Sequence, residues 1–258
     1  MKWSIAPGDH KGTDPFGDNP GAPAPSVTTR GPGPFGDNMV AVNETEAGDG
    51  RGRIVILNGA PRSGKSSIAE VIQATFDGPW MNLGVDVFSR AVTPPRYRPG
   101  MGLRPGGERP DIEALIPSLY AAFYDSVAAH SLHGLHVVVD VGHHDAYSVP
   151  LHVLRHAASR LAGLPVLLLV GVHCPVETIM ERRDAGHPDR EGHYVTSTPG
   201  QPVPEAVVRW QREVHVPGIY DLEVDTSATT PEQCAALIRA RLEGPPASAI
   251  SRLLSAPG

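Results

Sequence analysis

The sequence has 258 residues, and its 22 Lys+Arg against 28 Asp+Glu give a formal net charge of −6. A chain of this length has room for one α/β domain of roughly 200 residues, and its acidic balance offers no basic face to a nucleic-acid backbone, which excludes nucleic acid as an expected partner. The longest apolar run, 165–172, is too short to span a bilayer, and residues 1–10 lack the apolar centre of a signal peptide, so we expect no membrane partner and a cytoplasmic protein.

The two ends of the chain differ in composition from its middle. Residues 1–50 are rich in Gly, Pro, Asp, Asn and Thr and cannot bury enough apolar surface to offset the entropy of ordering, so we expect a disordered tail. Pro245 and Pro246 introduce a second segment, 245–258, that we expect to be flexible. One domain is expected at 51–244, with Cys174 and Cys234 as free thiols.

Between these ends, strand-like and helix-like hydrophobic patterns alternate. Several short runs are continuous in Val, Leu and Ile, as is typical of strands covered on both faces. The alternation predicts an α/β fold, a five-stranded parallel sheet with helices on both faces. Pro117 predicts a kink or break in the second helix. The expected strands are 53–57, 80–85, 136–141, 166–172 and 222–224, and the expected helices are 65–76, 111–130, 149–161, 176–185, 205–215 and 231–242.

A phosphate-binding loop (P-loop) follows the first expected strand. Its glycines let the backbone curl so that N–H groups point at the phosphates, and the helix that follows adds the positive end of its dipole. Lys65 is expected to reach the β- and γ-phosphates, and the Ser66 hydroxyl is expected to bind Mg²⁺. We therefore expect ATP and Mg²⁺ as cofactors. The motif is G-x-x-x-x-G-K-S, and the expected nucleotide-binding residues are Gly59, Ala60, Pro61, Arg62, Ser63, Gly64, Lys65, Ser66 and Ser67.

Two carboxylates are expected at strand ends, where parallel sheets bind their ligands. Asp140 closes an apolar strand in the manner of a Walker B carboxylate, which holds Mg²⁺ directly or through water. Asp86 closes the second strand. We expect it to orient an acceptor hydroxyl and to accept its proton. The alternative for each is a structural Asp that caps the next turn, and the roles exchange if the strand order differs.

These residues resemble the chloramphenicol phosphotransferase-like family of P-loop kinases, over about 53–242. The resemblance rests on the segments Ile56-Leu57-Asn58-Gly59, Pro79-Trp80, Gly84-Val85-Asp86, Val170-Gly171-Val172-His173-Cys174, Glu181-Arg182-Arg183, Asp189-Arg190 and Val224-Asp225-Thr226, and on Asp140. It implies a nucleotide-kinase-like P-loop fold, Asp86 as the base, adenine near 225–227, and a lid bearing arginines.

Arginine positions favour the same lid between 181 and 192. Arg183 and Arg190 are expected to close over the transferring phosphoryl group, since Gly186 and Pro188 interrupt the segment. The alternative is a solvated helix end rich in arginine. A proline- and arginine-rich loop at 90–110 has no counterpart in the family, and acceptor recognition is expected near it. His143, His144 and Asp145 follow Asp140 and are expected in a solvated loop, with contact to the substrate as the alternative.

The leading functional hypothesis is an ATP-dependent O-phosphotransferase that acts on a hydroxyl of a small organic molecule, including chloramphenicol or a related antibiotic. A nucleoside or metabolite kinase on the same fold is one alternative. A nucleotide-binding protein that does not transfer phosphate is another, although the presence of Asp86 and Asp140 counts against it. The expected partner is the hydroxylated acceptor, and assembly into homo-oligomers is left open.

Overall fold

A computed structural model describes residues 50–256, apart from 107–108, 165–166 and 187–193. The expected disorder of residues 1–49 therefore lies outside the described part of the chain. None of the helices in the described part is long and apolar enough to cross a membrane.

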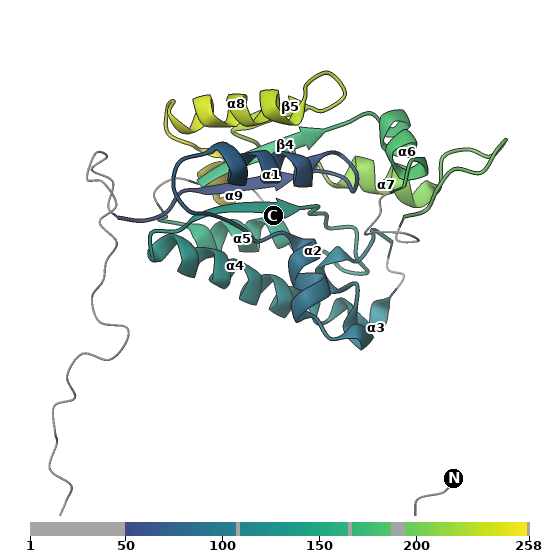
Figure 1. Ribbon diagram of the computed structural model, residues 1–258. Coiled ribbons are helices and arrows are strands. Elements are labelled where there is room, and N and C mark those ends of the chain that lie inside the picture. Colours follow the sequence, from purple (N-terminus) through teal and green to yellow (C-terminus); the bar gives the residue numbers. More distant parts are fainter. Residues whose placement is uncertain (1–49, 107–108, 165–166, 187–193, 257–258) are drawn as a thin grey trace, which may run out of the picture. The chain divides into compact units, whose positions relative to one another are not determined.

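A five-stranded parallel sheet forms the centre of the fold (Figure 1). The strand order is β2-β3-β1-β4-β5, so β3 lies beside β1 and β2 lies one strand further out. All five predicted strands are present, and β1 is buried along its whole length because helices cover both faces of the sheet. The strands are β1 Ile54–Asn58, β2 Trp80–Asn82, β3 His136–Val141, β4 Leu167–His173 and β5 Leu222–Asp225.

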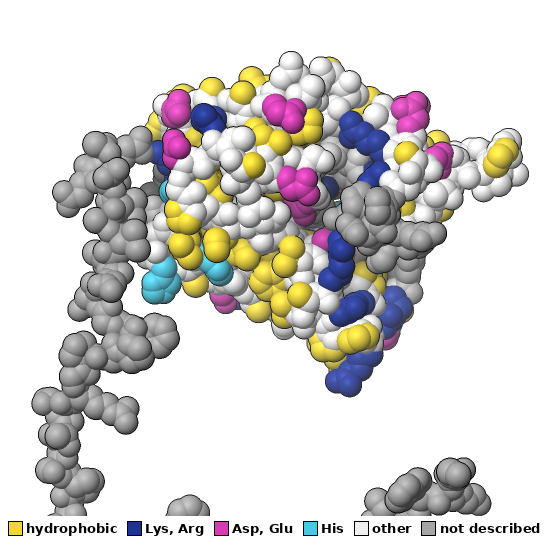
Figure 2. Space-filling model, in the orientation of Figure 1, with side chains coloured by type: hydrophobic (Ala, Val, Ile, Leu, Met, Phe, Trp, Pro, Cys, Tyr) yellow, Lys and Arg dark blue, Asp and Glu magenta, His cyan; other side chains and the backbone are white. Residues whose placement is uncertain are grey.

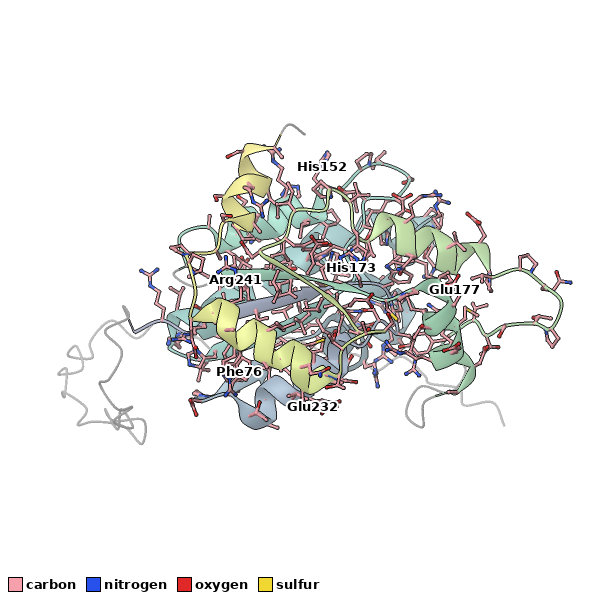
Figure 3. All side chains as sticks on the ribbon, turned by 90° about the horizontal axis from the view of Figure 1, so that it is seen from above. Phe76, His152, His173, Glu177, Glu232 and Arg241 are labelled. Atoms are coloured by element: carbon pink, nitrogen blue, oxygen red, sulfur yellow. The ribbon has the colours of Figure 1, made fainter. Side chains whose placement is uncertain are left out.

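Helices α1 (Lys65–Thr75) and α8 (Pro231–Leu242) cover one face of this sheet. Their buried side chains, such as Ile68 and Ile238, pack with the Val and Leu residues that point to this face. Figure 3 views this layer from above, with Glu232 in the first turn of α8. A capping box formed by Thr230 and Gln233 starts α8, which begins where the sequence predicts.

The opposite face packs against α4 (Ile116–Leu132), α5 (Val153–Leu161) and α9 (Ala249–Ser255), whose apolar residues share one core with the sheet. Further helical elements lie at the end of the sheet where the strands finish (Figure 1). The longer ones are α6 Val176–Asp184 and α7 Glu205–Glu213. The short ones are α2 Val85–Val87, η1 Phe88–Val92, η2 Pro95–Tyr97, η3 Gly100–Gly102 and α3 Pro110–Glu113.

Three predicted elements differ from the structure by more than two residues. β2 ends at Asn82 instead of 85, because the chain turns at Gly84 into α2. The predicted helix 111–130 is two helices, α3 and α4, and Pro117 lies in the first turn of α4, which confirms the expected break. The helix predicted from 149 starts only at Val153, because His152 has a left-handed backbone with φ of 49°.

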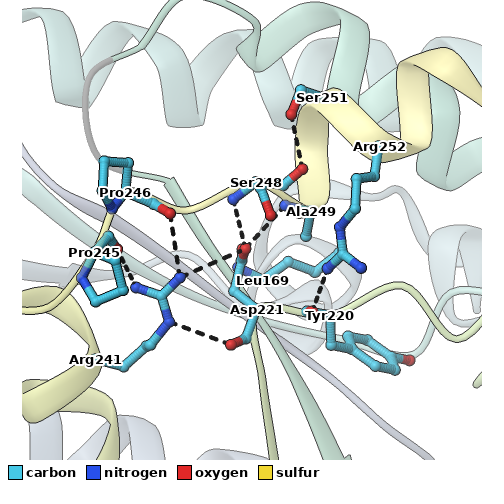
Figure 4. Close-up of polar contacts among 10 residues, drawn as sticks. All are labelled: Leu169, Tyr220, Asp221, Arg241, Pro245, Pro246, Ser248, Ala249, Ser251 and Arg252. Atoms are coloured by element: carbon cyan, nitrogen blue, oxygen red, sulfur yellow. Dashed lines mark hydrogen bonds and ion pairs between the residues drawn. The ribbon is translucent and has the colours of Figure 1, made fainter.

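The C-terminal segment is not the flexible tail that the sequence suggests. Its helix α9 buries Ala249 completely and leaves Leu253 only 4% exposed. The Asp221 side chain, 1% exposed, accepts hydrogen bonds from the backbone N–H groups of Ser248 (2.7 Å) and Ala249 (2.8 Å), and of Leu169 (3.1 Å) on β4 (Figure 4). The Gly and Pro content of 245–258 could not indicate this contact, because Asp221 lies 27 residues before Ser248.

Asp221→Ala should therefore lower the melting temperature by about 5–10 °C, because three backbone N–H groups lose their acceptor and about 2–3 kcal/mol of stability is lost with them. Thermal unfolding followed by circular dichroism measures the change. Ser251→Ala is a matched control, since that hydroxyl bonds only the Ser248 carbonyl within this contact network. Equal melting temperatures for the two variants would show that Asp221 does not hold α9 in place.

Candidate active site

The P-loop lies between β1 and α1, as predicted. Gly64 has φ of 96°, a left-handed conformation that favours glycine, and α1 begins at the next residue. Gly59 lies so close to β4 that an added Cβ would stand 2.3 Å from the Val172 carbonyl oxygen. Lys65, only 9% exposed, donates from Nζ to the carbonyl oxygen of Ala60 at 2.9 Å. Its ammonium group therefore lies inside the loop, where the terminal phosphates of a nucleotide bind.

Ser66 and Asp140 meet beside this loop. The Ser66 Oγ donates to Asp140 Oδ2 at 2.6 Å, and Asp140 is 9% exposed. Register explains the contact, because Asp140 on β3 is paired with Leu57 on β1, near the start of the loop. β3 ends at Val141, as predicted, one residue after Asp140.

Hydroxyl and carboxylate oxygens are ligands that suit Mg²⁺, which usually takes one or two protein ligands and keeps its remaining positions for phosphate oxygens and water. The Ser66–Asp140 pair fits that requirement. Among the described residues, no group of three or more His, Cys, Asp or Glu side chains is placed to hold a metal by itself. The donor set therefore suits a metal that arrives with a nucleotide.

Asp86 lies in α2 and not at a strand end, which corrects the predicted position. Its side chain is 47% exposed, and Oδ2 is 3.8 Å from Nη2 of Arg90, one helical turn later. The turn into α2 is nevertheless close to the Asp140 carboxylate, since a Cβ added to Gly84 would lie 2.8 Å from Asp140 Oδ1. The structure thus brings Asp86 to the same edge of the sheet as Asp140, one strand further from the P-loop.

Arg182 braces the nucleotide loop to β5. It donates from Nη2 to the Thr226 carbonyl oxygen at 2.7 Å and from Nη1 to the Thr226 hydroxyl at 3.1 Å. Thr226 Oγ1 in turn donates to the Ser63 carbonyl oxygen at 2.7 Å, and Arg62 donates to the Arg182 and Gly186 carbonyl oxygens. The segment expected beside adenine, 225–227, therefore lies against the P-loop. This bracing role of Arg182 was not predicted, because its partner Thr226 lies 44 residues later.

Arg183 is buried near the end of α6, with 6% exposure. Its guanidinium carbon lies 5.3 Å from the Tyr194 ring centroid, and Nη1 donates to the Val195 carbonyl oxygen at 3.4 Å. Burial is the main cause that lowers the pKa of Arg183; Tyr194 opposes this shift, and neighbouring arginines add to it. The second predicted lid arginine, Arg190, lies outside the described residues.

Basic side chains gather near α2 and α3 (Figure 2). Some of these arginines hydrogen-bond to the backbone of the loop at 90–110. Arg98 donates from Nε to the Thr93 carbonyl oxygen at 3.0 Å, and Arg109 donates to the carbonyl oxygens of Arg98 and Arg96, both at 3.2 Å. These two arginines therefore fix the backbone of the loop that the sequence favours for acceptor recognition.

His143 and His144, expected in a solvated loop, are buried, with 3% and 4% exposure. Asn58, at the end of β1, accepts a hydrogen bond from the His143 backbone N–H at 2.8 Å, which draws the loop after β3 inward. His143 Nε2 contacts the Tyr124 hydroxyl, and burial lowers the pKa of His143 to about 3. The ring is thus neutral at physiological pH.

The sequence pattern assigned no role to Trp210, which lies in α7. Its side chain is 9% exposed, and its ring centroid lies 5.8 Å from that of His144 at an interplanar angle of 83°. An apolar residue at this spacing in a helix is expected to pack in the core, and Trp210 does share an apolar cluster with Val207 and Val214. Helical spacing does not predict where the N–H group of the indole lies.

The strand order, the P-loop between β1 and α1, and the carboxylate on β3 define the nucleotide-kinase-like P-loop fold. Residues 52–243 match the model of a family described as chloramphenicol phosphotransferase-like protein. The chain belongs to this family.

Solved kinase structures are also similar. The APS kinase of Mycobacterium tuberculosis is 17% identical with a TM-score of 0.48, and the match covers 75% of this chain and 99% of that one. The shikimate kinase of Aquifex aeolicus is 18% identical with a TM-score of 0.44, covering 74% and 96%. A sugar kinase from Janibacter is 15% identical with a TM-score of 0.46, covering 74% and 95%. A comparison with curated proteins found no match.

Proposed function

We propose that this protein is an ATP-dependent O-phosphotransferase that transfers the γ-phosphoryl group to a hydroxyl of a small organic molecule. The observation that carries the proposal is the Ser66–Asp140 contact beside a P-loop whose lysine is already buried in the phosphate cradle. This pair forms the metal side of a phosphoryl-transfer site, and a second carboxylate, Asp86, lies one strand further out, where an acceptor hydroxyl would bind.

In this mechanism, the backbone N–H groups of the P-loop hold the phosphates, and Lys65 offsets the charge of the β- and γ-phosphates. Ser66 and Asp140 would hold Mg²⁺, which would offset the negative charge of the phosphates when bound. The Asp86 carboxylate takes the proton of the acceptor hydroxyl. The acceptor oxygen then bonds to the γ-phosphorus, the bond from that phosphorus to the β–γ bridging oxygen breaks, and ADP leaves. Arg183 and Arg190 close over the transferring group.

Release of ADP from Mg·ATP, measured with and without acceptor, tests this function. The panel contains chloramphenicol, nucleosides and polyols, because the acceptor decides between an antibiotic kinase and a nucleoside or metabolite kinase. At least one compound should raise ADP release to on the order of 1 s⁻¹ or more, as in characterised kinases. Tight binding of Mg·ATP without acceptor-dependent ADP release across the panel would favour a non-catalytic nucleotide-binding protein.

A further inference from the structure

Three buried ring nitrogens near the end of β3 have no hydrogen-bond partner among the described residues: Nδ1 of His143, Nδ1 of His144 and Nε1 of Trp210. The last two belong to side chains that are 4% and 9% exposed. Buried polar groups in native proteins nearly always have a partner, so each such atom requires an explanation. The rings of His144 and Trp210 are adjacent, with centroids 5.8 Å apart.

The position of these atoms relates them to the site. A Cβ added to Gly142 would lie 3.4 Å from Trp210 Nε1 and 3.2 Å from the carbonyl oxygen of Gly59. Gly59 opens the P-loop, and Gly142 follows Asp140 by two residues. The indole edge therefore lies where β1 and β3 end, at the edge of the sheet that carries the proposed chemistry.

The hydrogen-bonding character of each atom can be assigned. His144 Nε2 lies 2.9 Å from the carbonyl oxygen of Leu103, and because a carbonyl only accepts, Nε2 carries the proton. Burial is the main cause that lowers the pKa of His144, so the ring is neutral and Nδ1 has a free lone pair. The indole Nε1–H of Trp210 only donates. One donor and one acceptor, on rings that touch edge to face, are thus left without a partner among the described residues.

We propose that Trp210 and His144 form a subsite for a hydroxyl of the acceptor other than the one that is phosphorylated. The indole N–H donates to the oxygen of this hydroxyl, and the hydroxyl donates to His144 Nδ1. A hydroxyl satisfies both groups at once, whereas a carboxylate or phosphate would oppose the lone pair on Nδ1 and an ammonium group would leave the indole unpaired. This inference rests on the proposed phosphotransferase function.

The subsite favours acceptors with at least two hydroxyls. Asp86 lies in α2, which follows β2, and the Trp210 indole lies beside Gly142, which follows the neighbouring β3. An acceptor that reaches both groups therefore needs the reacting hydroxyl and a second one. The expected substrate class is a polyhydroxylated small molecule.

The indole N–H of Trp210 provides a direct readout. The chain has three tryptophans, so an isotope-labelled sample gives three indole signals, and Trp210→Phe identifies one of them. We expect this signal to move when protein with bound Mg·ADP is titrated with glycerol, D-ribose or chloramphenicol, and to stay in place with 1-propanol. A signal that no polyhydroxylated compound moves overturns the subsite, including the case in which ordered water alone occupies it.

Kinetics supply the second arm. Trp210→Phe keeps the ring and removes the donor, so the KM for a diol acceptor should rise about tenfold with kcat nearly unchanged, because one hydrogen bond made equally in the ground and transition states is lost. His144→Phe should act in the same direction. Trp80→Phe is the matched control, since that indole N–H donates to the Asp77 carbonyl oxygen at the far end of the sheet.

The outcomes separate this inference from the proposed function. Acceptor-dependent ADP release with equal KM values for the parent and Trp210→Phe overturns the subsite and leaves the phosphotransferase assignment intact. An equal rise in KM for a diol and for its analogue that keeps only the reacting hydroxyl also overturns it, because the lost contact would then not involve the second hydroxyl. A moving indole signal without acceptor-dependent ADP release supports the subsite and contradicts phosphoryl transfer.

Discussion

Replacing Lys65 by alanine should lower phosphoryl transfer by about a hundredfold or more, which corresponds to a barrier increase of about 3 kcal/mol. The Lys65 ammonium group lies inside the P-loop, 2.9 Å from the Ala60 carbonyl oxygen, and a charge there stabilises both the bound phosphates and the transition state. ADP release with a responsive acceptor measures the loss.

Two controls make this result specific. Lys65→Arg keeps the positive charge but has a broad planar fork that does not fit inside the loop, so a large loss is expected there as well. Thermal unfolding of both variants shows whether the fold is kept, since Lys65 is a buried residue of α1. If the alanine variant turned over like the parent, the assignment of the P-loop as the phosphate site would be wrong.

The features that the sequence predicted correctly are those that neighbouring residues determine. The P-loop lies within eight consecutive positions, and strand, loop and helix follow each other directly, so Gly59, Lys65 and Ser66 could be placed without any tertiary contact. Strands β1, β3 and β4 were also predictable, because their runs of Val, Leu and Ile are buried on both faces. The roles of Asp86 and Asp140 depend on the strand order, which has β3 beside β1 and β2 further out, and the roles themselves stay predictions.

The features that the sequence did not predict depend on distant partners. His144 is held by the Leu103 carbonyl oxygen, 41 residues earlier, and α9 is anchored by Asp221. Neither partner lies within the window in which hydrophobic periodicity or turn composition is read. Trp210 was missed for a different reason. Its burial follows from helical spacing, but the orientation of its N–H depends on how α7 meets the end of β3.

The second large effect concerns Asp86. Asp86→Asn keeps the shape of the side chain but removes the proton acceptor, and general-base help is worth roughly a hundred- to ten-thousandfold, about 3 to 5 kcal/mol. Affinity for Mg·ATP should barely change, because Asp86 lies beyond β3 from the P-loop. Arg90→Ala is the control. This variant removes the ion pair between Arg90 and Asp86. Both side chains are 47% exposed, and ion pairs this exposed contribute little to stability.

Asp140→Asn should show a different pattern, because Asp140 contacts Ser66 at 2.6 Å on the metal side of the site. We expect weaker binding of Mg·ATP and a higher Mg²⁺ requirement along with the loss of rate. Calorimetry of Mg·ATP binding and ADP release, measured on both variants, separate the two roles, since a base affects only transfer whereas a metal ligand affects binding as well. Near-normal transfer by Asp86→Asn, together with lost transfer and unchanged metal dependence for Asp140→Asn, would exchange the assignments and make Asp140 the base.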